Sequence, residues 1–344
     1  MKNNYPYIPT RAFFEPDALN YPLGQKIYKT LKELGVPILQ TPSHNRVTGI
    51  PGKTPQQQYL EGKNTMVVGV RRINDFQTCK PSAHYQLPLN TSCPGKCEYC
   101  YLNTTLGKKP YLRVYVNTEE ILQKTQDYIF KNIPQVTIFE GAATSDPLPT
   151  EPYTGNLAKT IEFFSSQEYG RFRFVTKYTN VDSLLDITHN GNTRFRFSLN
   201  SDYVINKFEH NTPKLAERVT AAGKVSQAEY PLGFIIGPII VYDGYQQEYI
   251  ELLKNLRTTL NPKAFPGLAF ELITHRFTKK AKNQILEVFP QTELPMDEES
   301  RQFKFGQFGY GKYIYPRETM AGLKTFFQEK IGEYFPEAEM SYFI

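Results

Sequence analysis

The sequence predicts an α/β fold built on a partial parallel barrel of about six strands. Strand-like and helix-like segments alternate from about residue 85 to residue 290. The expected strands are Tyr85–Leu89, Gln135–Phe139, Arg171–Thr176, Arg194–Leu199, Leu232–Ile240 and Leu268–Ile273. The expected helices are Thr118–Lys131, Asn156–Ser166, Asn180–Asp186, Pro213–Ala222, Gln246–Thr259 and Lys279–Val288. Six strand–helix units are too few for a closed eight-fold barrel, and such barrels carry their sites at the carboxyl ends of the strands.

Two further segments flank this predicted barrel of residues 85–290. Residues 1–84 form an expected N-terminal α/β segment packed on the barrel, with a helix at Gly24–Leu34, a loop over 41–64 and a strand at Thr65–Arg71. Residues 291–344 are expected to form a β-hairpin around Gly306–Tyr313, followed by a helix near Glu318–Ile331.

Composition limits the class of protein. The 344 residues carry a formal charge of +6 and four cysteines. No apolar run reaches the roughly 18 residues of a membrane-spanning helix, and the N-terminus lacks the apolar core of a signal peptide, so we expect a cytoplasmic protein with no membrane partner. The basic surplus fits a polyanionic partner, although it equally serves solubility.

Three of the four cysteines lie within eight residues, as Cys93, Cys97 and Cys100 in a CxxxCxxC pattern. A short loop with a glycine can direct three thiolates at one centre and leave a fourth position open. Four cysteines at zinc-finger spacing would instead indicate a closed structural site. The alternatives are chance clustering or a zinc ion completed by a histidine, although no histidine lies close in sequence. The pattern resembles the loop of radical S-adenosylmethionine (SAM) enzymes, in which SAM binds the open iron of a [4Fe–4S] cluster.

Longer runs make the resemblance more specific. The stretch from Cys93 to Gly107, the runs Thr144-Ser145-Asp146 and Arg173–Lys177, and the segment His275–Lys279 look like the spore photoproduct lyase family. That family reverses a methylene-bridged thymine dimer, the spore photoproduct, that ultraviolet light forms in spore DNA. The resemblance implies a radical SAM carbon–carbon lyase with a partial (β/α)6 barrel, acting through a 5′-deoxyadenosyl radical. It also implies damaged DNA and a one-electron donor, such as flavodoxin or ferredoxin, as partners; the oligomeric state is not indicated.

The same resemblance assigns roles to individual residues. It implies that Cys93, Cys97 and Cys100 hold the cluster. It places four residues at strand ends around SAM, namely Ser145, Lys177, Ser198 and Asn200, each of which could instead cap a strand or carry a surface charge. Tyr99 and Tyr101 match tyrosines that relay a hydrogen atom, or else pack beneath the cluster.

The first departure from the family is Ala143, which stands where the family has the cysteine that returns a hydrogen atom to the product. An alanine has no S–H bond to give. Either the chain finishes repair poorly, or another donor serves, or the substrate is a different photoproduct. The candidate donors are Tyr99, Tyr101 and Cys79, which stands where related chains look to have a serine; Cys79 could also be an incidental thiol.

The second departure lies in the hairpin, where Gln307 and Phe308 replace the arginine and tyrosine of the family. Phe308 can still stack on a base, and Gln307 can bond a base edge. Further expected DNA contacts are Lys312, Tyr313 and Arg276, unless the hairpin is simply a solvated element. Two departures favour a paralogue over a point mutant. The competing functions are a radical SAM enzyme for another photoproduct or nucleotide, and a damage-binding protein that turns over poorly.

Overall fold

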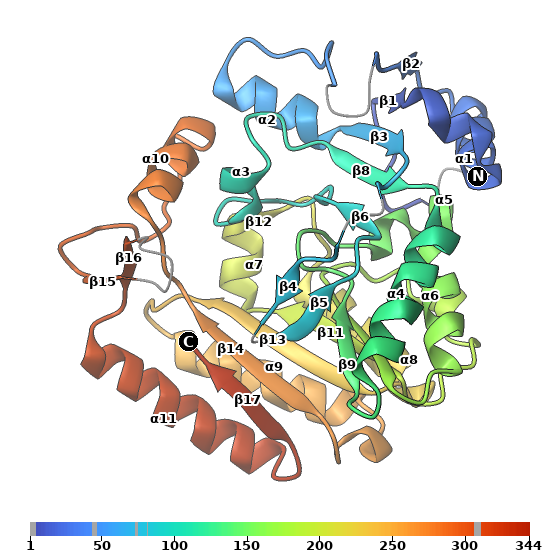
Figure 1. Ribbon diagram of the computed structural model, residues 1–344. Coiled ribbons are helices and arrows are strands. Elements are labelled where there is room, and N and C mark those ends of the chain that lie inside the picture. The colour runs from blue at the N-terminus through green and yellow to red at the C-terminus, as the bar shows by residue number, and fades with distance from the viewer. Residues whose placement is uncertain (1–4, 43–46, 73–74, 81, 306–310) are drawn as a thin grey trace. The chain divides into compact units, whose positions relative to one another are not determined.

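The computed structural model describes residues 5–42, 47–72, 75–80, 82–305 and 311–344 (Figure 1). The chain forms two compact units. The first comprises Met1–Pro94 and Leu106–Arg194, and the second comprises Gly95–Thr105 and Phe195–Ile344. The boundaries expected after residues 84 and 290 remain predictions.

The first unit begins with a five-stranded sheet in the order β2-β1-β3-β8-β6. Its strands are β1 (Arg11–Phe14), β2 (Ile38–Gln40), β3 (Thr65–Gly69), β6 (Asn90–Thr91) and β8 (Leu112–Tyr115). All pairs are parallel except that of β6 with β8. The expected strand at Thr65–Arg71 is confirmed as β3, which is buried throughout. The expected helix is confirmed as α1 (Pro22–Glu33), whose Leu23, Ile27 and Leu31 join the same core as β3.

Four other strands of this unit follow the order β10-β9-β5-β4. They are β4 (Thr78–Cys79), β5 (Ala83–Gln86), β9 (Thr137–Glu140) and β10 (Gly170–Thr176). Strands β5, β9 and β10 are parallel, whereas β4 is antiparallel to β5. Helix α4 (Thr118–Asn132) lies beside β9, and α6 (Asn156–Ser165) lies beside α4 (Figure 1). The short elements η2 (Pro16–Asn20), η3 (Leu148–Thr150) and α5 (Glu151–Thr154) complete the connections.

The second unit contains parallel strands in the order β11-β13-β14-β17. These are β11 (Thr193–Leu199), β13 (Leu232–Ile239), β14 (Ala269–Thr274) and β17 (Glu339–Phe343). Phe195, Phe197 and Leu199 are fully buried on β11. The helices of this unit are α3 (Leu102–Thr105), α7 (Asp202–Phe208), α8 (Leu215–Gln227), α9 (Tyr245–Thr259), α10 (Lys279–Val288) and α11 (Arg317–Tyr334). Two antiparallel pairs, β7 (Lys96–Cys97) with β12 (Glu209–His210) and β15 (Gln302–Phe305) with β16 (Gly311–Ile314), and the short η5 (Pro262–Ala264) complete it.

Three expectations about elements need correction. The segment expected to be a helix at Asn180–Asp186 forms only a single 3₁₀ turn, η4 (Asp182–Leu184). Asn180 does not cap a helix there, because its amide nitrogen donates to the Leu148 carbonyl and its side-chain oxygen has no hydrogen-bond partner among the described residues. The expected loop over 41–64 contains helix α2 (Pro55–Lys63), which begins at a Thr54–Gln57 capping box. Strand β17 was not expected. The hairpin is confirmed as β15 and β16, but its tip, with Gln307 and Phe308, lies outside the described residues.

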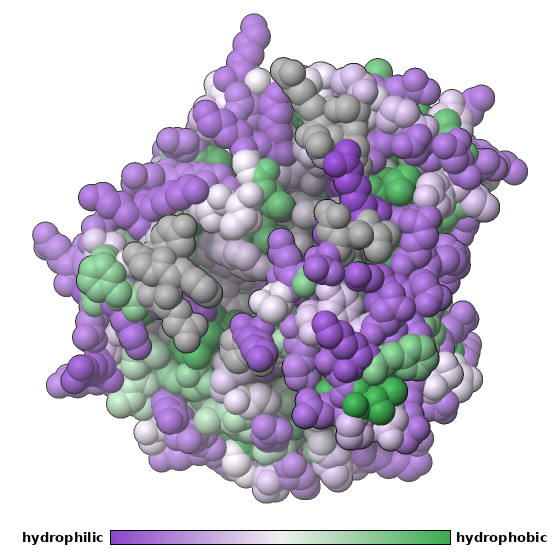
Figure 2. Space-filling model, in the orientation of Figure 1, coloured by the Kyte–Doolittle hydropathy of each residue, from purple (hydrophilic) through white to green (hydrophobic). Residues whose placement is uncertain are grey.

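Hydrophilic side chains dominate the face shown in Figure 2, and hydrophobic residues occur there singly or in small groups. The largest exposed hydrophobic residues include Phe130, Tyr101 and Phe305, at 64%, 60% and 72% exposure. Isolated exposed apolar residues of this kind are ordinary. Within the described ranges, no helix has the length and apolar character needed to span a bilayer.

Candidate active site

The cysteine motif is anchored in the second unit by a short β-ladder. Strand β7, which ends at Cys97, pairs with β12, so that Cys97 lies opposite Glu209. The ladder continues through the Glu98 amide, which donates to the Phe208 carbonyl at 3.0 Å. A turn then brings the Cys100 amide to the Cys97 carbonyl at 3.3 Å. These contacts hold the last two cysteines of the motif in one compact segment.

The donor set suits an iron–sulfur cluster. All four cysteines are thiols rather than disulfides, with Cys97 buried and Cys93 and Cys100 half-buried. No three His, Cys, Asp or Glu side chains in the described part of the chain group as ligands of a single metal ion. A [4Fe–4S] cluster makes a different demand, because each thiolate binds a different iron. The three thiols of Cys93, Cys97 and Cys100 are therefore the residues that would hold the cluster.

Tyr99, between the last two cysteines, is tied to a buried ion pair. Its hydroxyl donates to Glu209 Oε1. The other carboxylate oxygen of Glu209 accepts from Arg218 Nη2 at 2.6 Å, and both of these side chains are fully buried. Burial and the neighbouring Glu209 charge raise the pKa of Tyr99 well above its ordinary value. Tyr99 is thus a neutral phenol whose hydroxyl proton is held in a hydrogen bond to the Glu209 carboxylate.

The predicted SAM residues of the first unit, Ser145 and Lys177, are joined by Asp146. Its carboxylate accepts from the Lys177 amide at 2.8 Å, from the Thr176 hydroxyl at 3.0 Å and from the Leu148 amide at 3.2 Å. Burial raises the pKa of Asp146 to about 6, although these hydrogen bonds oppose the shift. The carboxylate therefore ties the end of β10 to the turn that carries Ser145. Sequence reasoning missed Asp146, which the run Thr144-Ser145-Asp146 already contains.

The predicted SAM residues of the second unit, Ser198 and Asn200, lie at the end of β11. The Asn200 amide nitrogen donates to the Pro238 carbonyl at 2.8 Å, and its oxygen accepts from the Tyr249 hydroxyl at 2.6 Å and from the Ser201 amide. The Ser198 carbonyl accepts from Arg218 Nη1 at 3.0 Å. Arg218 therefore connects the Tyr99–Glu209 contact to the strand end that carries Ser198.

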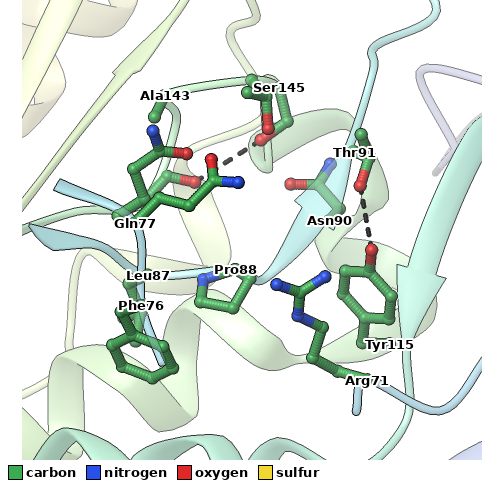
Figure 3. A pocket seen from close by; sticks show the side chains of 13 residues that line it. Arg71, Phe76, Gln77, Leu87, Pro88, Asn90, Thr91, Tyr115, Ala143 and Ser145 are labelled. Carbon is green, nitrogen blue, oxygen red and sulfur yellow. Dashed lines mark hydrogen bonds between the residues drawn. The ribbon is translucent and has the colours of Figure 1, made fainter. Parts of the chain in front are cut away.

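A pocket in the first unit contains both Ala143 and Ser145 (Figure 3). Its volume is about 170 Å³. It is lined by Arg71, Phe76, Gln77, Gln86, Leu87, Pro88, Asn90, Thr91, Tyr115, Gly141, Ala143, Thr144 and Ser145. Ala143, where the family resemblance predicts a cysteine, thus lines a cavity that also holds a predicted SAM residue. Sequence reasoning did not identify Arg71, Gln77 or Asn90, because they lie in or near short strands and belong to no motif of their own.

The predicted DNA contacts that are described gather beside the hairpin of the second unit. Tyr313 of β16 stacks on Phe277 with ring centroids 5.3 Å apart, and the two residues exchange backbone hydrogen bonds. Burial, followed by the charges of Arg276 and Lys304, lowers the pKa of Lys312. Neighbouring cations that repel one another in this way form a favourable place for a phosphate. We call Arg276, Lys304 and Lys312 the hairpin basic group.

Comparison with known proteins decides the family. The family model described as spore photoproduct lyase matches residues 7–344. The chain belongs to the spore photoproduct lyase family.

Relatives and solved structures agree with this membership. The spore photoproduct lyase of Clostridium acetobutylicum is 51% identical over 97% of this chain and 98% of its own length. That of Bacillus subtilis strain 168 is 46% identical over 98% and 99%. A mutant spore photoproduct lyase structure with bound AdoMet and dinucleoside spore photoproduct matches with a TM-score of 0.95 and 49% identity, covering 98% of this chain and all of that one. A second structure, complexed with dinucleoside spore photoproduct, matches with a TM-score of 0.95 and 48% identity.

The structural match confirms the α/β partial-barrel class expected from the strand–helix alternation. The roles of individual residues in the family resemblance remain predictions. Cys79 lies on β4 of the first unit and is half-buried, and the residue two places before it, Gln77, lines the pocket that contains Ala143. Tyr101 is largely exposed, and its carbonyl accepts from the Thr104 hydroxyl at 2.7 Å.

Proposed function

We propose that this protein is a radical SAM lyase that reverses the spore photoproduct in DNA to two thymines. The observation that carries the proposal is the match, along 98% of the chain and at a TM-score of 0.95, to a spore photoproduct lyase structure with bound AdoMet and dinucleoside spore photoproduct. The thiols of Cys93, Cys97 and Cys100 are the expected ligands of the [4Fe–4S] cluster. When bound, the cluster and SAM together supply the 5′-deoxyadenosyl radical that starts the reaction.

The chain's own residues would then position the reacting groups. The Asp146 carboxylate accepts a hydrogen bond from the Lys177 amide and so fixes the backbone there. Because Asp146 directly follows Ser145 in the chain, it would position both predicted SAM residues of the first unit. In the second unit, Arg218 and Glu209 hold Tyr99 next to the cysteines. The hairpin basic group of Arg276, Lys304 and Lys312 is the surface that we assign to the DNA backbone.

Hydrogen return is the step at which we expect this chain to differ from the family resemblance, because Ala143 has no weak S–H bond from which to donate a hydrogen atom. We assign the donor role to Cys79. The Tyr99 hydroxyl is already hydrogen-bonded to Glu209, and Tyr101 is largely exposed. Cys79 carries a thiol two residues from Gln77, which lines the pocket that contains Ala143. The mutant structure named above carries a cysteine-to-alanine and a serine-to-cysteine substitution. In this chain, likewise, an alanine (Ala143) stands where the family resemblance predicts a cysteine, and a cysteine (Cys79) stands where it predicts a serine.

The test is an anaerobic assay of the reconstituted protein with SAM, reductant and synthetic dinucleoside spore photoproduct, in which thymidine product and 5′-deoxyadenosine are both measured. We expect clean thymidine release from the wild type. Cys79→Ser should still form 5′-deoxyadenosine but lose most of the clean product, and Ala143→Cys in that background should recover it. Cys97→Ala serves as the control that lacks both products.

Other outcomes would point elsewhere. SAM cleavage by the wild type without thymidine would favour another photoproduct or nucleotide as substrate. Binding of the lesion without repeated 5′-deoxyadenosine formation would favour a damage-binding protein. Unchanged repair by Cys79→Ser would move the donor role to Tyr101 or Tyr99. We also propose a cytoplasmic location and a small redox protein such as flavodoxin or ferredoxin as electron donor, which the thiol ligands and the radical chemistry would require.

A further inference from the structure

The pocket of Figure 3 offers a place for one flat ring. Its volume of about 170 Å³ exceeds the roughly 150 Å³ of an engineered cavity that takes up benzene. Phe76, Leu87 and Pro88 form an apolar part of the lining, and Arg71 and Gln77 add hydrogen-bond donors. The Arg71 guanidinium lies over the Tyr115 ring, 5.7 Å from its centroid. A pocket that combines apolar side chains with several hydrogen-bonding groups is suited to a nucleobase.

One polar atom in this lining lacks a partner. Asn90 of β6 is only 4% exposed, and its amide nitrogen donates to the Asp146 carbonyl at 3.0 Å. This bond fixes which way the amide faces. The other end, Oδ1, is buried and has no hydrogen-bond partner among the residues that the structure describes. Figure 3 shows the amide among the pocket side chains. A buried acceptor without a donor destabilises a protein, so such an atom points to a ligand that supplies an N–H or O–H group.

The neighbours of Asn90 indicate which ligand that is. A thymine ring carries an imide N3–H between two carbonyl oxygens, so the matching protein surface has an acceptor accompanied by donors. Asn90 Oδ1 is the acceptor, and Arg71 and Gln77 are the donors in the same lining. Ala143, the position from which the family returns a hydrogen atom to the lesion, lines this pocket as well.

We propose that Asn90 is a specificity-determining residue that accepts a hydrogen bond from the imide N3–H of a thymine in the lesion, with Arg71 and Gln77 donating to the adjacent carbonyls. This assignment rests on the proposed function. The same N–H chemistry could come from an amine of SAM, because Ser145 shares the pocket. The experiment must therefore measure the two ligands separately.

The experiment measures equilibrium binding to the anaerobic, cluster-loaded protein. The ligands are SAM, the unmodified dinucleoside spore photoproduct, and two analogues methylated at N3 of one thymine or the other. The proteins are the wild type, Asn90→Ala and Thr91→Val. Thr91 lines the same pocket, but its hydroxyl is already hydrogen-bonded to Tyr115 at 3.0 Å, which makes it a matched control. Thermal unfolding of each variant checks that it folds.

We expect one of the two methylated analogues to bind the wild type roughly 5- to 100-fold more weakly than the unmodified lesion, since a buried acceptor is then left unpaired. Asn90→Ala should bind the unmodified lesion more weakly by a similar factor and should lose most of the methylation penalty, whereas Thr91→Val should keep it. SAM affinity should not change. Because the wild-type arm needs no substitution, a variant that fails to fold does not decide the result.

Three results would overturn the assignment. Equal binding of all three lesions by the wild type would show that no imide N–H is read. An undiminished penalty in Asn90→Ala would place the contact on another residue. Weaker SAM binding by Asn90→Ala with unchanged lesion binding would assign the acceptor to SAM. A wild type that does not bind the unmodified lesion at all would instead contradict the proposed function.

Discussion

Glu209 is the residue on which the cysteine motif depends within the second unit. Its carboxylate accepts from Tyr99 on one oxygen and from Arg218 on the other, and both charged side chains are fully buried. A buried charge is tolerated only when it is paired and hydrogen-bonded, and here each carboxylate oxygen has a donor. The arginine also donates to the carbonyls of Pro213 and Ser198. One side chain thus fixes the motif, the start of α8 and the end of β11.

Arg218→Met should therefore be strongly destabilising. The substitution keeps much of the side-chain length but leaves Glu209 buried without its cation, and breaking such a pair costs about 3–5 kcal/mol. We expect a fall of that size in the free energy of unfolding by urea. We also expect the iron content per protein and the characteristic cluster absorbance to fall after reconstitution, because the segment with Cys97 loses its anchor.

The matched control for that experiment is Lys263→Met, which removes one partner of the exposed Lys263–Glu229 pair at 2.7 Å. Exposed pairs contribute little to stability because water and salt screen them. The control should unfold like the wild type and hold its cluster normally. If both variants behaved alike, the Glu209–Arg218 pair would have no special part in holding the motif.

At the scale of elements, the hairpin and the end of β14 act together within the second unit. Phe277, which follows β14, stacks on Tyr313 of β16 and bonds to its backbone. Arg301 supports the same region, since its guanidinium lies 3.7 Å from the Tyr315 ring centroid and donates to the His275 carbonyl at 2.8 Å. This packing fixes the position of the hairpin basic group, which includes the predicted DNA contacts Arg276 and Lys312.

Lys312→Gln should weaken the binding of DNA by a similar factor whatever the base sequence of the DNA. The depressed pKa of Lys312 reflects burial and the repulsion of Arg276 and Lys304, which a phosphate would relieve. We expect a lower affinity for a lesion-containing duplex and a slope of log K against log salt that is smaller by about 1. The measurement is a salt titration of binding followed by fluorescence anisotropy.

Lys330→Gln on α11 is the control for this titration. Lys330 lies on another element and pairs with Glu333 at 2.7 Å. It should leave both the affinity and the salt slope unchanged. A Lys312→Gln protein with the wild-type slope would mean that the hairpin basic group does not touch the DNA backbone.

Across the whole molecule, buried ionisable groups change the stability with pH in opposite directions. Burial raises the pKa of Asp146 to about 6 and that of Glu151 to about 7. Both bind protons more tightly in the folded than in the unfolded chain, so their contribution to stability is lost as the pH rises toward 6 or 7. Burial and the Arg301 charge lower the pKa of His275 to about 3. Its contribution is complete above the ordinary histidine range and is lost as the pH falls.

His275→Gln should remove the histidine part of this balance. Between pH 6.5 and about pH 3, His275 is protonated in the unfolded wild type but neutral in the folded protein. The wild type should therefore lose stability relative to the variant on acidification, by at most about 1.4 kcal/mol per pH unit. Urea unfolding of both proteins at pH 7.5, 6 and 5 measures the difference.

Stability curves of the wild type and His275→Gln that stay parallel between pH 7.5 and 5 would contradict the assignment of a neutral, buried imidazole.

Much of the fold follows from local sequence. The helix at Lys279–Val288 is found at the expected residues, because Thr278 caps it and the apolar spacing continues until Val288. Strands β10, β11 and β13 lie within about one residue of their expected bounds, since hydrophobic alternation and flanking turns define them. Expectations were wrong where a side chain had a distant partner, as at Asn180, or where a helix had few apolar residues, as at α2.

Spacing along the chain and local pattern are enough to predict the family, the fold class and the three candidate ligand thiols of Cys93, Cys97 and Cys100. The partners of the site residues depend instead on the tertiary structure. Arg218 is more than a hundred residues from Tyr99, and Asp146 is separated from Asn90 by 56 positions, yet each pair shares one hydrogen-bond network. Burial and pairing depend on which segments meet in space. The sequence therefore gives no sign that the Asn90 oxygen has no hydrogen-bond partner among the described residues, or that the Tyr99 hydroxyl donates to Glu209.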